Sequence, residues 1–220
     1  MSTREQAPVA LQPQLKTKSR FDFVLGWFGG PWTNGDYPQS LKDTLRDLLP
    51  EFTQEEKNLI KGSCDFFAID GYTAFYAGAL QGGAFEDCIS NSSYPGYPEC
   101  AGTSSNDPNG FGIGPGADPG AGWLKSTPGG IRKFLKAITQ DLFPNVKDIM
   151  VSEFGFSEPF ESSYTNLQDA LWDLRRADYL QGFLDNILMA IHHDKINVTG
   201  AFIWSICRFC IVYKLSRDVS

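Results

Sequence analysis

At 220 residues, with 42% hydrophobic and 14% aromatic residues, the chain is long and apolar enough to form a domain with its own core, which excludes disorder of the whole chain. Its 19 basic and 26 acidic residues give a net charge of -7, so its field repels phosphate backbones and makes nucleic acid a poor partner. No apolar run reaches the roughly 18 residues of a membrane span, and we therefore expect no membrane partner.

The N-terminal residues 1–20 are polar, contain two prolines and show no periodicity. This composition predicts a disordered leader, with folded structure from Phe21. The segment also lacks the continuous apolar stretch of a secretory signal, which predicts a cytoplasmic location by default. The alternative is that the chain derives from a secreted parent protein.

The first predicted elements are two helices and a strand. Leu41, Leu45 and Leu48 recur at helical spacing, and Thr53-Gln54-Glu55-Glu56 reads as a capping box that opens a second helix, which Gly62 can end. The apolar run at residues 65–69 then predicts a strand that stops at Asp70-Gly71. Helical segments therefore precede the first strand.

Residues 77–126 are rich in Gly, Pro, Ser and Asn and show almost no pattern, which predicts a long loop that is either functional or disordered. Cys88 and Cys100 flank a turn-rich part of it that a disulfide could close, although two free thiols remain the alternative. Asn91 matches the N-glycosylation acceptor pattern, as does Asn197, but short patterns also arise by chance.

The remaining elements alternate between helix and strand. Thr127-Pro128 begins a helix with Ile131, Phe134, Leu135 and Ile138 along one face, and a strand follows at residues 148–152. A long helix comes next, followed by a strand at residues 200–205; the buried stripe expected on this helix is Leu180, Leu184, Ile187 and Ile191.

Continuous apolar strands that alternate with helices predict an α/β fold with a parallel sheet. A (β/α)₈ TIM barrel needs eight strands and about 250 residues, whereas only three strands are visible here. The sequence therefore predicts part of a barrel, with the three strands parallel and adjacent in sequence order.

Reactive groups of barrel enzymes lie at the C-terminal ends of the strands. Asp70 with Tyr72, Glu153, and Trp204 occupy these positions here. A carboxylate that leaves an apolar strand can serve as a nucleophile or base, although Glu153 could equally cap the loop that follows it. Trp123 and Trp204 could stack on the apolar C–H faces of a sugar, or they could pack in the core.

Four segments of the first 73 residues resemble glycoside hydrolase family 1, the β-glucosidase family. Residues 25–28 and 35–38 are similar to its segment L-G-W-F…G-D-Y-P, and residues 49–53 continue it. Residues 65–73 resemble the sixth strand, D-F-F-G-I-N-x-Y-T, whose tyrosine contacts the nucleophile. The resemblance gives this role to Tyr72, whereas Asp70 replaces the asparagine of the family in its substrate-binding position.

Three later segments extend the resemblance in the same order. Residues 122–130 are similar to G-W-x-x-x-P-x-G, in which the tryptophan, here Trp123, forms a platform on the leaving-group side of the sugar. Residues 151–155 resemble I-T-E-N-G, whose glutamate, here Glu153, is the nucleophile. Residues 200–205 are similar to the eighth strand, G-x-F-x-W-S, whose tryptophan forms the floor of the glucose-binding subsite. The resemblance gives this role to Trp204.

The resemblance runs from about Phe21 to Ile206, so it implies the C-terminal part of the barrel, with strands six to eight. The acid/base glutamate of the family lies in an Asn-Glu-Pro motif on the fourth strand, and this motif is absent from the 220 residues. Residues 207–220 form a divergent tail in place of the family's D-N-F-E-W. The Cys207-x-x-Cys210 pattern within it lacks a second ligand pair, so that no metal site is predicted.

The resemblance implies a retaining β-glucosidase-like hydrolase that acts on O-glycosidic bonds of β-glucosides or oligosaccharides without a cofactor. Because the acid/base motif is missing, we expect a weakly active or inactive fragment. The alternative is a non-catalytic carbohydrate-binding or interaction remnant that uses the two tryptophans. Three barrel strands leave two sheet edges unpaired, which makes self-association through those edges an expected outcome.

Overall fold

The computed structural model of the chain describes residues 18–78 and 85–205. Residues 18–20 are already helical, so folded structure begins slightly before the expected start at Phe21. The rest of the predicted leader lies outside the described residues, as does the divergent tail with its Cys207-x-x-Cys210 pattern. Within the described part, no helix combines the length and hydrophobicity that a membrane span requires.

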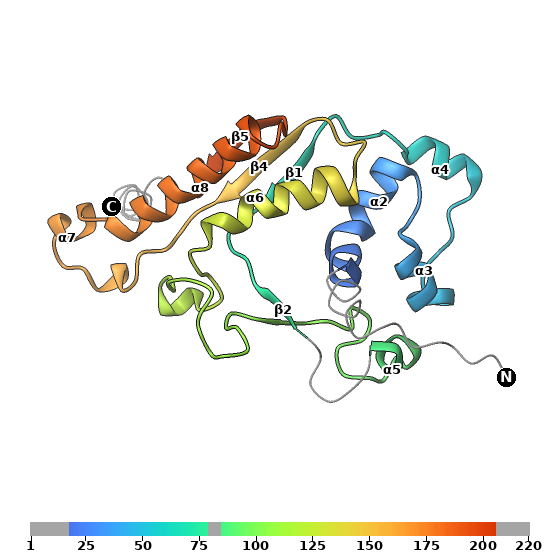
Figure 1. The fold of residues 1–220 in the computed structure, drawn as a ribbon, viewed down its shortest axis with the longest axis horizontal. Coiled ribbons are helices and arrows are strands. Elements are labelled where there is room, and N and C mark those ends of the chain that lie inside the picture. Colours follow the sequence, from blue (N-terminus) through green and yellow to red (C-terminus); the bar gives the residue numbers. More distant parts are fainter. Residues whose placement is uncertain (1–17, 79–84, 206–220) are drawn as a thin grey trace, which may run out of the picture. The chain divides into compact units, whose positions relative to one another are not determined.

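Two compact units make up the chain, and the first contains residues 1–65 and 75–107 (Figure 1). The helical elements described in its first half are η1 (Asp22–Gly26), α2 (Trp27–Asn34), α3 (Gln39–Leu45), η2 (Arg46–Leu48) and α4 (Gln54–Ile60). The α2 helix ends where Gly35 adopts a φ of 83°, a left-handed conformation that glycine adopts without a steric penalty. These helices account for the helical segments predicted before the first strand.

The first unit has a small apolar core. Phe23, Leu41, Leu45 and Leu49 are buried together. Leu48, which has helical spacing from Leu45, is exposed instead because the chain tightens into the 3₁₀ turn η2 and turns Leu49 inward. The predicted capping box of α4 is present, with Thr53 and Glu56 bonded reciprocally.

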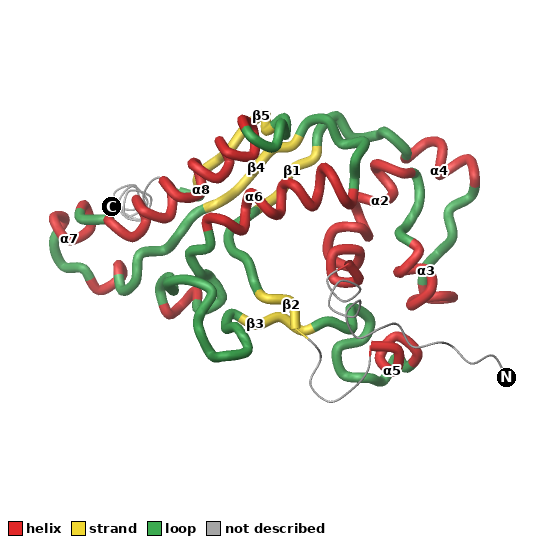
Figure 2. Tube along the Cα trace, in the orientation of Figure 1, coloured by secondary structure: helices red, strands yellow, loops and turns green. Residues whose placement is uncertain are grey.

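The segment predicted as a patternless loop contains short elements. Strands β2 (Tyr76–Gly78) and β3 (Gly102–Ser104) pair antiparallel, and α5 (Phe85–Ser90) lies between them in sequence (Figure 2). A disulfide joins Cys88 to Cys100, both of which are buried. Three-residue strands and a six-residue helix are too short to produce a readable hydrophobic period, which explains why the pattern missed them.

The second unit, residues 66–74 and 108–220, contains a three-stranded sheet. Its strands are β1 (Phe67–Asp70), β4 (Ile149–Phe154) and β5 (Val198–Ile203), which are parallel and in the order β1-β4-β5. The predicted parallel order is therefore confirmed. Since crossover connections are right-handed, the helices between these strands lie on one face of the sheet.

Helices α6 (Pro128–Lys136), which continues as the π-helical turn η4 (Ala137–Leu142), and α8 (Leu174–His192) pack against each other along the sheet (Figure 1). The predicted face of α6 is largely confirmed, because Ile131, Leu135 and Ile138 are buried. The stripe predicted for α8 is wrong in part: Leu184 is exposed, whereas Tyr179 and Phe183 occupy the core. Their rings stack with centroids 4.1 Å apart.

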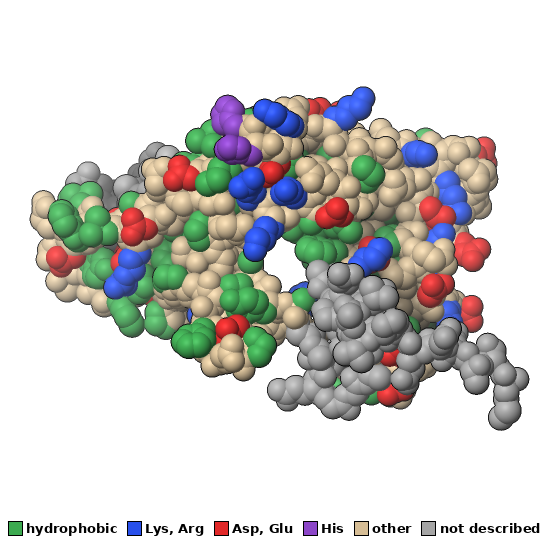
Figure 3. Space-filling view, viewed as in Figure 1, with side chains coloured by type: hydrophobic (Ala, Val, Ile, Leu, Met, Phe, Trp, Pro, Cys, Tyr) green, Lys and Arg blue, Asp and Glu red, His purple; other side chains and the backbone are tan. Residues whose placement is uncertain are grey.

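The other face of the sheet is open. Alternate residues of β1 show this, because Phe67 and Ile69 are buried whereas Ala68 and Asp70 are exposed. Parallel sheets are normally covered on both faces, and the described strands form no closed barrel. Large apolar side chains are also exposed near α7 (Leu167–Leu171), as Figure 3 shows; they are Phe160, Leu167, Leu171, Trp172 and Leu174. The unit is thus a partial α/β barrel.

Candidate active site

Glu153 lies in β4, the central strand of the sheet, one residue before the strand ends at Phe154. Its backbone carbonyl accepts a 2.8 Å hydrogen bond from the N–H of Gly71, which follows β1. Its side-chain Oε2 accepts a 2.7 Å hydrogen bond from the hydroxyl of Tyr72. The C-terminal ends of two neighbouring parallel strands thus bring together the two residues for which catalytic roles were predicted.

The Tyr72 hydroxyl is fixed as a hydrogen-bond donor. Burial, the hydrogen bond to Glu153 and the nearby negative charges of Glu153 and Asp70 all raise the pKa of the Tyr72 phenol well above its usual range. The backbone carbonyl of Tyr72 accepts a 2.7 Å hydrogen bond from the hydroxyl of Tyr179, a buried residue of α8. A neutral phenol is therefore held against the carboxylate.

Trp123 lies beside Tyr72. The two rings meet edge to face, with centroids 6.0 Å apart and an interplanar angle of 77°. The next residue, Leu124, is buried and anchors this part of the loop, whereas Trp123 itself is 54% exposed. The indole thus has one contact with the site and a large surface available to a ligand, as a stacking platform requires.

Asp70, which was predicted to bind substrate, forms its hydrogen bond with a residue of the neighbouring strand. Its Oδ1 accepts a 2.8 Å hydrogen bond from the hydroxyl of Ser152, the residue before Glu153, and its side chain is exposed. This hydrogen bond therefore links β1 to β4 on the open face of the sheet.

Trp204 follows β5, and its backbone N–H donates a 2.8 Å hydrogen bond to the carbonyl of Phe154. Its indole is 63% exposed and makes no hydrogen bond or ring contact with Tyr72 or Glu153 within residues 18–78 and 85–205. The structure thus places the backbone of Trp204 at the same strand end as Glu153 and leaves its ring open. Of the five predicted site residues, Tyr72, Glu153 and Trp123 form one connected group.

Gly155 is a site-supporting residue that was not among the predicted site residues. A Cβ atom at this position would lie 1.8 Å from the carbonyl oxygen of Trp204. The end of β4 can therefore approach the end of β5 this closely only because Gly155 has no side chain. The motif V-S-E-F-G contains this glycine, so its spacing is the signal that could have identified it.

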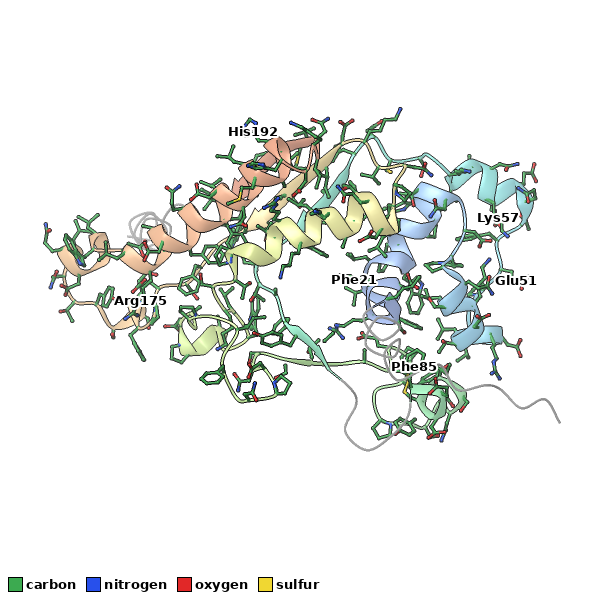
Figure 4. All side chains as sticks on the ribbon, viewed as in Figure 1. Phe21, Glu51, Lys57, Phe85, Arg175 and His192 are labelled. Atoms are coloured by element: carbon green, nitrogen blue, oxygen red, sulfur yellow. A yellow bond between two sulfur atoms is a disulfide. The ribbon has the colours of Figure 1, made fainter. Side chains whose placement is uncertain are left out.

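A buried ionic cluster follows the candidate nucleophile in sequence. The guanidinium of Arg176 donates hydrogen bonds to the carbonyl of Phe156 (3.0 Å) and to Glu161 (2.7 Å), and it forms an ion pair with Asp173 at 3.0 Å. Arg175, labelled in Figure 4, forms a weaker pair with Glu158 at 3.4 Å. Sequence reasoning missed this cluster, because the Asp173 to Arg176 spacing alone does not show that both side chains are turned inward.

Glu158 is 8% exposed, and its Oε2 has no hydrogen-bond partner in the described part of the chain. Burial is the main reason that the pKa of Glu158 is raised, against the opposing effect of Arg175; burial likewise raises the pKa of Asp173. Folding therefore favours the protonated form of Glu158. The stability that this proton contributes is complete below the pKa of Glu158 in the unfolded chain, near 4.5, and is lost as pH rises through its pKa in the folded chain.

Replacing Glu158 with glutamine should remove this part of the pH dependence. We expect the free energy of unfolding of the wild-type chain, relative to that of Glu158→Gln, to decrease as pH rises from 4.5 to 7, because only the wild type must bury a charge. Urea denaturation at a series of pH values measures the difference. Asp141→Asn, which removes an exposed carboxylate from the same unit, is the control; equal slopes for both variants would contradict the assignment.

No group of three or more His, Cys, Asp or Glu side chains suitable for a metal ion occurs within the described residues. The connected group at the strand ends consists instead of a carboxylate, a neutral phenol and an exposed indole. A carboxylate can act as a nucleophile or base, and an indole can bind an apolar face of a polar ligand. This combination suits a carbohydrate ligand.

Comparison with known proteins agrees with this geometry. Raucaffricine-O-beta-D-glucosidase of Rauvolfia serpentina is 37% identical over 185 residues, which cover 84% of this chain and 32% of that protein. Beta-glucosidase 19 of Arabidopsis thaliana is 37% identical over 186 residues, covering 84% of this chain and 34% of that protein. The chain thus spans about a third of the length of the curated relatives it matches.

Solved structures confirm the fold prediction. A GH1 beta-glucosidase from the fungus Humicola insolens, crystallised in complex with glucose, superposes with a TM-score of 0.75 at 30% identity. The match covers 88% of this chain and 38% of that chain. The three-stranded sheet therefore corresponds to part of the (β/α)₈ barrel of these β-glucosidases. The family model described as Glycosyl hydrolase family 1 matches residues 2–210, so the chain belongs to this family of glycosidases.

Proposed function

We propose that this chain supplies the nucleophile side of a retaining β-glucosidase site, with Glu153 as the nucleophile. The observation that carries the proposal is the 2.7 Å hydrogen bond from the Tyr72 hydroxyl to Glu153 Oε2 at the C-terminal ends of two adjacent parallel strands. Catalytic groups of barrel enzymes lie at this end of the strands. The names of the relatives, which are β-glucosidases, support a β-glucoside as the substrate.

The hydrogen bond leaves one carboxylate oxygen for chemistry. Tyr72 engages Oε2, whereas Oε1 accepts no hydrogen bond from any described residue. In the first step Oε1 attacks the anomeric carbon as the bond to the leaving oxygen breaks, which gives a covalent glycosyl-enzyme. In the second step a water oxygen attacks the same carbon and loses a proton to solvent, and the bond from that carbon to Oε1 breaks, so that Glu153 departs as a carboxylate. Tyr72 stabilises that departing charge because its own proton stays in place.

The two exposed indoles fit the sides of a bound sugar. Trp123, which contacts the ring of Tyr72, is suited to the leaving-group side, and Trp204 is suited to the floor of the glucose subsite. A pyranose presents apolar C–H faces that stack on such rings. Asp70, whose charge contributes to the raised pKa of Tyr72, can accept a hydrogen bond from a sugar hydroxyl in addition to the one from Ser152.

A retaining mechanism needs a second carboxyl about 5 Å from the nucleophile, to protonate the leaving oxygen and then to activate water. The Asn-Glu-Pro motif that carries this group in the family is absent from the 220 residues. The loss of a general acid typically costs a factor of about 10² to 10⁴. We therefore propose that the chain reacts with glucosides that have activated leaving groups and turns over unactivated disaccharides at a rate near background.

Tyr72→Phe provides the test. This change removes the hydroxyl that contacts Glu153 and keeps the ring that contacts Trp123. We expect the covalent labelling of the chain by a 2-fluoro glucoside with an activated leaving group to slow by about 10- to 100-fold, because the hydroxyl holds Oε2 and thereby orients Oε1 for attack. Mass spectrometry of the intact chain over time measures the rate.

Tyr164→Phe is the matched control, because the Tyr164 hydroxyl makes only a long 3.5 Å contact with the carbonyl of Pro159. It should label at the wild-type rate. Equal labelling rates for Tyr72→Phe and the wild type, with both chains folded, would show that the hydrogen bond has no catalytic role.

A further inference from the structure

The disulfide-closed loop of the first unit displays a site for covalent modification. Asn91-Ser92-Ser93 matches the N-glycosylation acceptor pattern, and all three residues are exposed. The segment lies directly after α5, between Cys88 and Cys100. A bulky, soluble glycan requires such a surface position.

The local conformation presents the Asn91 side chain in a defined way. Its Oδ1 accepts a 3.0 Å hydrogen bond from the backbone N–H of Ser93, which forms an Asx turn across the acceptor pattern. Its backbone N–H donates to the carbonyl of Cys88, and its backbone carbonyl accepts from Tyr94. The side-chain amide nitrogen, Nδ2, donates to no group within the described residues and is therefore available for a new bond.

The opposite half of the loop carries the contacts that fix it to its unit. The Tyr97 hydroxyl donates a 2.9 Å hydrogen bond to the carbonyl of Thr44, and the Tyr97 ring packs on the core cluster. Ser19 donates to the carbonyl of Glu99 at 3.0 Å, and Arg20 forms an ion pair with the Glu99 carboxylate. A glycan on Asn91 would leave all of these contacts in place.

The Cys88–Cys100 disulfide gives independent evidence for the compartment. Disulfides form and persist in oxidising compartments such as the endoplasmic reticulum and are rare in the cytosol. Both half-cystines are buried, so the bridge is part of the folded loop near Phe85, which Figure 4 labels. The compartment that forms this bridge is also the one in which asparagine acceptors meet the glycosylation machinery.

The second acceptor pattern, Asn197-Val198-Thr199, is placed differently. The Nδ2 of Asn197 already donates to the carboxylate of Asp148, and its backbone carbonyl accepts a 3.1 Å hydrogen bond from the N–H of Ile149. Asn197 lies immediately before β5 (Val198–Ile203). Modification there would cost the bond to Asp148.

We propose that Asn91 is N-glycosylated, that the chain matures in the secretory pathway with the Cys88–Cys100 bridge formed, and that Asn197 is unmodified. In the reaction Nδ2 attacks the anomeric carbon of a lipid-linked oligosaccharide diphosphate. A C–N bond forms, the bond from that carbon to the phosphate oxygen breaks, and the lipid diphosphate leaves as Nδ2 loses one proton.

The test uses the full chain, directed by an added secretion signal through a yeast or insect-cell host. Treatment with peptide N-glycosidase in H₂¹⁸O converts a glycosylated asparagine to ¹⁸O-labelled aspartate, which peptide mass spectrometry locates. We expect the label at Asn91 only and one glycan-sized mobility shift, which is lost in Asn91→Gln and in Ser93→Ala. Because Ser93→Ala keeps Asn91 and the backbone N–H of its turn, it separates loss of the acceptor pattern from misfolding of the loop.

Asn197→Gln should keep the full shift. The proposal is overturned by a wild-type chain without a shift, by a shift that persists in Asn91→Gln, by label at Asn197, or by a secreted chain in which Cys88 and Cys100 react as free thiols.

Discussion

Replacing Gly155 with alanine is expected to lower the free energy of unfolding of the second unit by about 3 kcal/mol, at the high end of overpacking effects. The new Cβ would lie 1.8 Å from the carbonyl oxygen of Trp204, and a backbone atom cannot rotate away as a flexible side chain can. The ends of β4 and β5 must then separate, which also strains the hydrogen bond from Trp204 to Phe154. Urea denaturation measures the loss.

Gly129→Ala is the matched control. Gly129 lies in the first turn of α6, and a Cβ there meets no atom within 4 Å. Alanine should be neutral there or stabilise by up to about 1 kcal/mol, because it restricts the unfolded chain and favours helix. If both variants unfolded at the same urea concentration as the wild type, the result would contradict the claim that β4 and β5 approach too closely at Gly155 for a side chain.

Arg176→Met is the second change with a large expected effect. It should destabilise the second unit by about 3 to 5 kcal/mol at pH 7, because removing one member of a buried ion pair leaves its partners charged and unpaired. Glu161 and Asp173 would both lose their contact with the guanidinium, as would the carbonyl of Phe156. The side chain of Arg176 is only 8% exposed, so that solvent cannot replace these bonds readily.

The pH dependence of this loss has a definite sign. Burial already raises the pKa of both Glu158 and Asp173, and removal of Arg176 takes away a charge that lowers both values. These carboxyls should accept protons more readily in the variant, so the destabilisation should be smaller at pH 5 than at pH 7.

Arg175→Met provides the comparison at the neighbouring position. Its side chain is 60% exposed and its pair with Glu158 spans 3.4 Å, so the expected effect is at most about 1 kcal/mol. Urea denaturation of both variants at pH 5 and pH 7 measures their free energies of unfolding and tests both expectations. Equal stabilities for the two variants at pH 7 would contradict a structural role for the buried cluster.

The sequence was a good guide to the strands and to the centre of the site. Apolar runs at residues 65–69, 148–152 and 200–205 predicted a parallel sheet, because strands buried under helices need continuous apolar sequence, and the observed strands span residues 67–70, 149–154 and 198–203. Parallel order then brings the residues that follow neighbouring strands together. This rule accounts for the contact between Tyr72 and Glu153 across 81 positions of sequence.

Features that depend on packing detail were out of reach. On α8, Leu184 and Phe183 are both apolar, and neighbouring helical positions differ by about 100° of rotation, so composition does not decide which one faces the core. Stacking with Tyr179 decides it in favour of Phe183. The inward turn of Arg176 likewise depends on the loop that presents Phe156 and Glu161, whose path no local pattern encodes.

Covalent labelling of Glu153 tests the central claim most directly. The reagent is a 2-deoxy-2-fluoro-β-glucosyl donor with a fluoride leaving group, which needs little help from a general acid and forms a long-lived glycosyl-enzyme. The first step can therefore proceed without the Asn-Glu-Pro motif. After prolonged incubation of the full chain, peptide mass spectrometry should find one fluoroglucosyl group on Glu153 and none on Glu153→Gln. Labelling of another carboxylate, or equal labelling of Glu153→Gln, would contradict the assignment of Glu153 as the nucleophile.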